Sequence, residues 1–200
     1  MPPHRSAAHP SDDALAATPP HYSGIARFFH WTVATLVLVT LPIGFIMSDR
    51  GERNIWDATT NQLYSSHKLI GLTILSLMVL RLAYRLTAGA PPSAATLAPA
   101  QKIVSETVHW ALYLLLIGVA IGGWLGISYF GALNAFGIQI PSLFGVAKNE
   151  DMAKQIFVYH AIGGTVIAGL VVLHISGALF HLIVKRDGVF QRMWPGKRSS

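Results

Sequence analysis

Four long apolar stretches follow one another along the chain, separated by short polar or basic segments. They span about residues 28–47, 63–85, 105–130 and 155–184. An α-helix needs roughly 20 apolar residues to cross the hydrocarbon core of a bilayer, and each stretch is long enough to do so. The pattern predicts an all-α fold, an integral membrane four-helix bundle in contact with the lipid bilayer.

The segments between these stretches have the composition of loops. Residues 48–62 are polar, residues 88–100 are rich in Pro, Ala and Ser, and residues 148–154 are charged. An uncharged run continues after Phe130 as far as Ala147, but Gly, Asn and Pro residues interrupt it. We expect this part to lie against the membrane surface as an apolar loop or interfacial segment.

The two ends of the chain differ from the apolar part in composition. Residues 1–21 contain no apolar core of a signal peptide, and their Pro, Ala and Ser content predicts a disordered cytoplasmic tail. We expect residues 22–195 to form the four-helix domain and residues 196–200 to form a basic C-terminal end.

Four crossings place both termini on the same side of the membrane, and the basic residues indicate which side. Ten of the 15 Lys and Arg residues fall on the side of the termini, namely Arg5, Arg27, Arg81, Arg85, Lys102, Lys185, Arg186, Arg192, Lys197 and Arg198. The positive-inside rule therefore predicts that both termini of this multi-pass protein are cytoplasmic. The net charge of +6 reflects these basic segments, and we expect no nucleic-acid partner.

Composition agrees with a membrane protein and narrows its chemistry. Hydrophobic residues make up 52% of the chain and charged residues only 12%, whereas a soluble domain is about one-quarter charged. The chain contains no cysteine, which excludes disulfides, iron–sulfur clusters, thiolate zinc sites and covalently attached haem.

Inside the apolar stretches, the residues able to bind a metal or exchange a proton are histidines. His160 and His174 are fourteen residues apart, which on a helix is about 21 Å of rise and a return to nearly the same face. The topology places His67 at the depth of His160 and His30 at the depth of His174. Because a buried imidazole needs a partner in an apolar helix, we expect these two depths to define two histidine pairs.

Two axial imidazoles from facing helices suit a six-coordinate b-type haem that is held without covalent attachment. Small residues follow three of the histidines by one turn on the same face, where a flat macrocycle would need room; they are Gly71, Gly163, Gly164, Gly177 and Ala178. Helix–helix packing is the alternative explanation for such small residues.

Intramembrane histidines can also bind other metals or belong to a transporter. A zinc or copper site normally includes cysteine, methionine or carboxylate ligands in one compact group. A proton or cation transporter normally has carboxylates within the membrane, and no Asp or Glu lies in the core of an apolar stretch. A metal or proton transporter built on histidines is therefore the alternative to a haem protein.

Further polar residues lie near the ends of the stretches. His109 and His181 are expected at the cytoplasmic surface, either as plain interfacial residues or as a pair that binds quinone or handles protons, since an imidazole can hydrogen-bond a quinone carbonyl. Arg81 and Arg85 are topology anchors or partners of haem propionates, and Lys68 is a candidate for the same role on the other side.

In order and spacing these features resemble the bacterial cytochrome b561 family over about residues 22–195. The matching residues are His30-Trp31, His67-Lys68, Gly71, Arg81, His109, Tyr113, Gly123-Trp124, His160, His174, Ala178, His181, Asp187-Gly188, Arg192-Met193 and Pro195.

The resemblance implies two haem b groups with bis-histidine iron, bound by His30 with His174 and by His67 with His160, in the bacterial inner membrane. It also implies electron exchange with the quinone pool. One branch of the family is similar to a superoxide oxidase, an oxidoreductase that passes electrons from periplasmic superoxide, a small one-electron donor, to ubiquinone. In that branch His181 matches a residue near the quinone.

Other relatives are cytochrome subunits that connect a partner dehydrogenase or a periplasmic redox protein to quinone. We therefore expect transmembrane electron transfer, with superoxide:ubiquinone oxidoreductase as the leading activity and a partner-dependent cytochrome subunit as the alternative. No catalytic residue is assigned, because the expected site residues bind cofactor or quinone.

Overall fold

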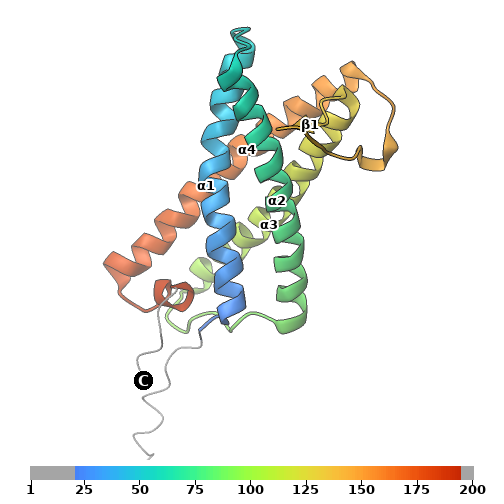
Figure 1. The fold of residues 1–200 in the computed structure, drawn as a ribbon. Coiled ribbons are helices and arrows are strands. Elements are labelled where there is room, and N and C mark those ends of the chain that lie inside the picture. Colours follow the sequence, from blue (N-terminus) through green and yellow to red (C-terminus); the bar gives the residue numbers. More distant parts are fainter. Residues whose placement is uncertain (1–20, 195–200) are drawn as a thin grey trace, which may run out of the picture.

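The computed structural model describes residues 21–194 of the protein (Figure 1). The chain forms four long helices, α1 (Gly24–Glu52), α2 (Ala58–Ala88), α3 (Pro99–Phe130) and α4 (Glu150–Leu179). Each is long and apolar enough to cross a membrane. The predicted all-α membrane bundle is confirmed, and the protein is a multi-pass membrane protein.

Three helices begin where a polar side chain caps the first turn. Ser23, Asp57 and Asn149 each accept a hydrogen bond from the backbone N–H three residues further on. Such a cap satisfies a donor that the first turn leaves without an intrahelical partner. The helices therefore extend beyond the apolar stretches, and the polar loop expected over residues 48–62 is reduced to residues 53–57.

The connection between α3 and α4 does not cross the membrane, as expected. It contains a short antiparallel hairpin of β1 (Asn134–Ala135) and β2 (Ile138–Gln139), followed by the 3-10 turn η2 (Leu143–Gly145). α3 ends at Gly131, whose φ of 83° is the left-handed conformation that glycine adopts readily at a helix C-terminus.

α4 does not continue as a regular helix through the whole of the last apolar stretch. After Leu179 the chain forms a π-helical turn, η3 (Phe180–Lys185), and then the 3-10 turn η4 (Phe190–Met193). We call residues 186–194 the C-terminal strap. Residues 1–20 of the expected tail and the basic end at 196–200 lie outside the described residues.

The four helices form two antiparallel hairpins that cross each other (Figure 1). α1 packs along α2, α2 along α3 and α3 along α4, whereas α1 and α4 approach each other over a much smaller area. The start of α1, the α2–α3 loop and the strap lie at one end of the bundle, which we call the terminal end. Both described ends of the chain are on the same side, as four crossings require.

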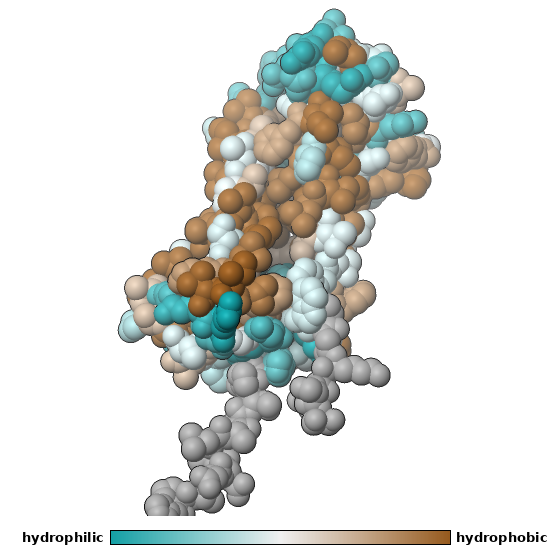
Figure 2. Space-filling model, turned by 90° about the vertical axis from the view of Figure 1, so that its left-hand side faces the viewer, coloured by the Kyte–Doolittle hydropathy of each residue, from teal (hydrophilic) through white to brown (hydrophobic). Residues whose placement is uncertain are grey.

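Apolar side chains occupy the centre of the bundle and also its outer surface. The buried core consists of Val33, Val37, Ile74, Met78, Tyr113 and Ile167. Figure 2 shows apolar side chains over the middle of one face and hydrophilic ones at both ends. A wide exposed apolar band between polar ends is the surface that a bilayer covers.

The close packing of α3 on α4 depends on a glycine. A Cβ atom at Gly163 would lie 2.4 Å from the Cγ2 atom of Val119. We expect Gly163→Val to lower the free energy of unfolding in detergent by about 1–3 kcal/mol, because the helices must separate to admit the side chain. Thermal unfolding of the purified protein measures this change.

Gly169→Val is the matched control, because it lies on the same helix and a Cβ at Gly169 meets no atom within 4 Å. Equal destabilisation by both variants would mean that helix propensity, and not the α3–α4 contact, explains the loss.

Candidate functional site

Two pairs of histidines face each other inside the bundle at two different heights. The ring centroids of His30 on α1 and His174 on α4 are 6.0 Å apart. The ring centroids of His67 on α2 and His160 on α4 are 5.9 Å apart. The first pair lies toward the terminal end and the second toward the opposite end. α4 contributes one histidine to each pair.

The spacing within each pair fits a metal bound between two imidazoles. A metal–imidazole bond is about 2 Å long, so two rings on opposite sides of one metal have centroids about 6 Å apart. Within residues 21–194, no group of three or more His, Cys, Asp or Glu residues is placed to hold a metal ion. Two-ligand sites suit a haem, whose macrocycle supplies the other ligands, better than they suit zinc.

Hydrogen bonds fix the ring nitrogens of the pair nearer the opposite end. His160 donates from Nδ1 to the backbone oxygen of Val119 on α3, at 2.9 Å. The Nδ1 atom of His67 lies 3.3 Å from the hydroxyl of the buried Thr40 on α1. A hydrogen bond at Nδ1 leaves Nε2 of the ring to bind a metal, and such outer partners orient a ligating imidazole.

Glycines on the neighbouring helices make room for these two rings. A Cβ atom at Gly123 on α3 would lie 2.8 Å from Cε1 of His160. A Cβ atom at Gly44 on α1 would lie 3.0 Å from Cε1 of His67. Each glycine follows the hydrogen-bond partner of the same histidine by four residues, so one helical turn both makes room for the ring and holds it.

Small residues beside the ligand candidates fall into two groups. A Cβ at Gly71, Gly164 or Gly177 would meet no atom within 4 Å, which agrees with positions kept small for a flat group. Gly163 instead lies against Val119, so helix–helix packing, the alternative explanation for the small residues, accounts for this glycine.

The pair at the terminal end has two further polar neighbours. The Nη2 atom of Arg81 on α2 lies 3.1 Å from Nδ1 of His30. The ring of His109 on α3 lies 5.2 Å from that of His174. Residues from all four helices thus meet here. His109 lies beside a ligand candidate, whereas the sequence suggests a pairing with His181.

Arg81 and Arg85 stack against aromatic rings of α3. The guanidinium of Arg81 lies 5.3 Å from the ring centroid of Tyr113, and that of Arg85 lies 5.0 Å from the ring centroid of Trp110. Cation–π contacts of this kind hold a guanidinium in place while its N–H groups stay available to an acid group.

Lys68 is engaged differently from the role considered for it. Its ammonium group donates to the backbone oxygens of Ala132 and Asn134. The side chain thereby fastens the loop after α3 to α2, directly beside His67. These two backbone acceptors are its hydrogen-bond partners in the structure, and its pairing with a haem propionate stays a prediction.

His181 lies in the π-helical turn η3 and pairs with Asp187 of the strap. The Nδ1 atom of His181 is 2.8 Å from Oδ2 of Asp187, and the two side chains are only 12% and 8% exposed. Asp187 also accepts hydrogen bonds from the backbone N–H of Val189 and the hydroxyl of Thr96. Burial acts to raise the pKa of Asp187, but these hydrogen bonds together lower the pKa below its ordinary value.

Comparison with known sequences decides the family. The family described as prokaryotic cytochrome b561 matches residues 21–196. The chain belongs to this family. It is therefore a membrane electron-transfer protein, and b-type haem binding follows from the family.

Two known proteins are similar to this b561 family member over nearly their whole length. A protein of Escherichia coli (strain K12) named cytochrome b561 homolog 2 is 28% identical over 186 residues, which covers 92% of this chain and 95% of the relative. A protein of Cereibacter sphaeroides named cytochrome b562 is 27% identical over 177 residues, which covers 87% of this chain and 95% of the relative.

Four residues that hold the histidines were not identified from sequence reasoning about ligands. They are Thr40, Gly44, Val119 and Asp187. The one sequence signal for such a contact is a glycine that lies at the same depth in the membrane as a histidine of the neighbouring helix. Gly123 and Asp187 entered only through the resemblance.

Gly123→Ala tests the glycine seat in this b561 family member. We expect the affinity for haem to fall about 10-fold or more, because the new methyl group displaces the ring of His160 from its hydrogen bond. Haem retained per chain after purification, measured from the Soret absorbance, reports the loss.

Gly122→Ala provides the control, since a Cβ at Gly122 meets nothing within 4 Å. If both variants retain haem as the unchanged protein does, the seat at Gly123 does not matter for binding.

Proposed function

We propose that this protein carries electrons across the bacterial inner membrane through two b-type haems and exchanges them with the quinone pool. His30 with His174 would hold one haem, and His67 with His160 would hold the other. The observation that carries this proposal is the pair of ring separations, 6.0 and 5.9 Å, at two heights of one bundle.

The residues around each pair support a role in holding haem rather than in binding substrate at iron. A bound haem supplies reversible one-electron exchange. Because both imidazoles of a pair would bind the haem, no coordination position would be left for a substrate. Val119 and Thr40 keep the opposite-end ligands oriented, while Arg81 and Arg85 offer guanidinium groups to propionates at the terminal end.

The distribution of charge supports a cytoplasmic terminal end. The described basic residues of this end include Arg27, Arg85, Lys102, Lys185 and Arg186. Cytoplasmic segments next to membrane helices are rich in such residues. We infer that the opposite end faces the periplasm, that electrons enter there, and that quinone binds at the terminal end near His181.

The leading activity is superoxide:ubiquinone oxidoreduction, in which superoxide gives one electron at the opposite end and ubiquinone accepts electrons at the terminal end. In this proposal the small size of superoxide matters, because the donor exchanges its electron at the edge of a buried group. Ubiquinone would reach the terminal end from the bilayer.

A second candidate is a cytochrome subunit that receives electrons from a partner redox protein, and the charges of the opposite end favour it. Four basic side chains of this end pair with acids, namely Arg50 with Asp57, Arg53 with Asp49, Lys148 with Glu150, and Lys154 with Asp151. The fifth, Lys68, is bound to backbone oxygens. The surface therefore has little excess positive charge to attract an anion.

Asp57, the acid that pairs with Arg50, stays ionised. The backbone N–H of Thr60 and the guanidinium of Arg50 lower the pKa of Asp57 to about 2. The Arg50–Asp57 pair consequently stays charged throughout the neutral pH range.

His30→Ala and His67→Ala are each expected to leave one haem per chain in place of two, because each removes an axial ligand of a different haem. Haem counted against protein concentration tests the number, and a redox titration should show that the two variants retain haems of different midpoint potential. His21→Ala is the control, since this exposed histidine lies outside both pairs. Two haems in either ligand variant would refute the assignment.

Mixing the haem-loaded protein with superoxide tests the donor. We expect haem reduction, followed by quinol formation when ubiquinone is present, at a rate that changes by no more than about twofold between low and physiological salt, because the basic groups are paired. Stopped-flow absorbance measures both steps. A protein with both haems that superoxide does not reduce, and that co-purifies with a larger redox protein, would establish the second candidate instead.

A further inference from the structure

We propose that Asp187 is a positioning residue that holds His181 in the tautomer with its proton on Nδ1, so that Nε2 faces the quinone and transfers protons to it. This inference rests on the proposed function, because it requires quinone to bind at the terminal end. It assigns to Asp187 a task that the haem ligands do not perform.

The first support is the geometry of the pair. His181 Nδ1 and Asp187 Oδ2 are 2.8 Å apart, and both side chains are largely buried. A carboxylate that accepts from Nδ1 fixes both the tautomer and the orientation of an imidazole, and it stabilises the ring when Nε2 gains a proton. The carboxylate itself need not take up the proton.

The second support is that Asp187 has no freedom to turn away. Its Oδ1 atom accepts from the backbone N–H of Val189 at 3.2 Å, and its Oδ2 atom lies 3.3 Å from the hydroxyl of Thr96. Thr96 belongs to the loop between α2 and α3. The carboxylate is therefore held from two segments far apart in the sequence.

The turn that brings Asp187 back to His181 depends on unusual backbone conformations. The chain forms the π-helical turn η3, and Arg186 then adopts the left-handed conformation with a φ of 51°. The backbone N–H of Arg186 donates to the oxygen of His181 at 2.8 Å. π-Helical turns often occur at functional sites, because they redirect a side chain that a regular helix would point elsewhere.

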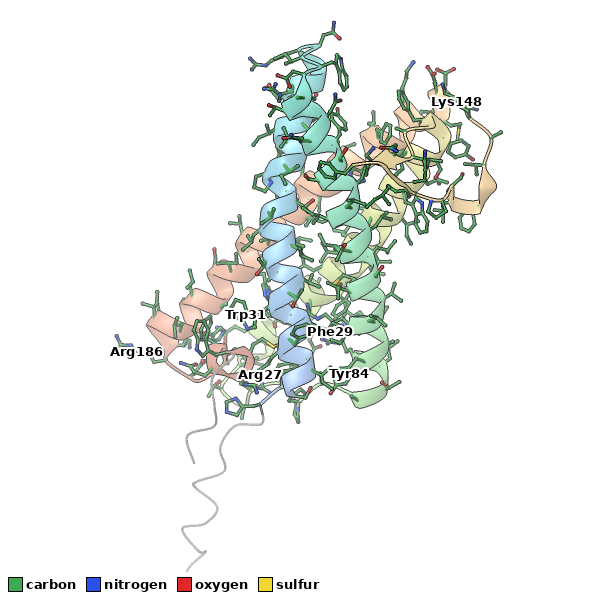
Figure 3. The ribbon with its side chains drawn as sticks, viewed as in Figure 1. Arg27, Phe29, Trp31, Tyr84, Lys148 and Arg186 are labelled. Atoms are coloured by element: carbon green, nitrogen blue, oxygen red, sulfur yellow. The ribbon has the colours of Figure 1, made fainter. Side chains whose placement is uncertain are left out.

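The strap is anchored on the opposite hairpin of the bundle. Trp31 of α1 donates from its indole nitrogen to the backbone oxygen of Met193 at 2.8 Å, and Arg27 donates to that of Trp194 at 2.9 Å. Arg192 donates to the backbone oxygen of Pro92 at 2.6 Å. Figure 3 shows Arg27 and Trp31 at this end, and Arg186 where the chain leaves α4.

His181 also has a suitable distance from the haem ligand candidate on its own helix. It follows His174 by seven residues, which corresponds to roughly 10 Å along the helix axis. A quinone at His181 would thus lie between the membrane surface and the terminal-end histidine pair.

The chemistry balances with the reactants that the proposed function supplies. Ubiquinone gains two electrons, which two one-electron donors provide in turn, and two protons to become ubiquinol. Nε2 of His181 first takes up a proton from water at the cytoplasmic side and then gives it to a quinone oxygen, and the same uptake and transfer are repeated for the second proton. The bond to Asp187 through Nδ1 persists during both transfers.

The other charged groups around the pair are mostly basic. Lys185 and Arg186 adjoin it in the sequence, and the strap and α1 carry Arg192 and Arg27. The start of α3, next to the loop that holds Thr96, carries Lys102 and Glu106, which are 4.0 Å apart. Asp187 is thus the carboxylate that bonds directly to His181.

The test compares Asp187→Asn and Asp187→Glu with the unchanged full-length protein, loaded with haem and reconstituted in lipid nanodiscs. We expect Asp187→Asn to keep its haem content and its reduction by dithionite, but to reoxidise with added ubiquinone about 10- to 100-fold more slowly and with an altered pH profile. Asp187→Glu should restore part of the rate, since it retains a carboxylate. Asp151→Asn, an exposed carboxylate at the opposite end, is the matched control.

Nitrogen-15 NMR of labelled histidine gives a second measure that does not depend on activity. The signal lost in His181→Ala identifies this residue. We expect it to report a proton on Nδ1 in the unchanged protein and a changed tautomer balance in Asp187→Asn.

The outcomes separate the two proposals. If ubiquinone does not oxidise the reduced haems of the unchanged protein, the proposed function fails, and the inference fails with it. If ubiquinone oxidises the unchanged protein and Asp187→Asn at the same rate, with the same pH profile and the same His181 tautomer, the inference alone is overturned. Slower reoxidation of Asp187→Asn at unchanged haem content, together with a changed tautomer balance of His181, supports the inference.

Discussion

An imidazole inside an apolar bundle needs a partner for its ring nitrogens, and this need organises the structure. α4 and the π-helical turn η3 that follows it carry three histidines and cannot satisfy them alone. α3 offers the backbone oxygen of Val119 to His160, the crossing of α1 brings His30 to His174, and the strap returns Asp187 to His181. The crossing of the two hairpins follows from the same demand, because each pair takes one ring from each hairpin.

The small residues show how the backbone serves this arrangement. Gly44 and Gly123 allow helices to approach the histidine rings from the side, and Gly163 allows α3 and α4 to approach each other. A single methyl group at any of these positions would push apart groups whose separation decides whether a metal fits between the rings. One turn of α3 carries both the hydrogen-bond acceptor for His160 and the glycine that contacts its ring. The positions of the histidines and the packing of the helices therefore depend on the same residues.

Apolar stretches predicted the four helices well, because hydropathy and length are strong signals in a membrane. The relative depths of His30, His67, His160 and His174 followed from topology and helix rise alone. The neighbour of His109 did not, because depth cannot say which way a helix is rotated. The link from His181 to Asp187 was also beyond prediction, since it needs a π-helical turn and a left-handed residue at Arg186 that no sequence pattern announces. The backbone acceptors of Lys68 could not be predicted for a related reason, because they belong to a loop that periodicity does not describe.

α4 supplies one member of each histidine pair and follows the other three long helices in the described part of the chain. Chain synthesis runs from the N-terminus, so His30 and His67 are made before the residues that face them. Neither pair exists until α4 has been made. A chain that lacks α4 would have no complete pair, so a cofactor held by the pairs would enter only after the synthesis of α4.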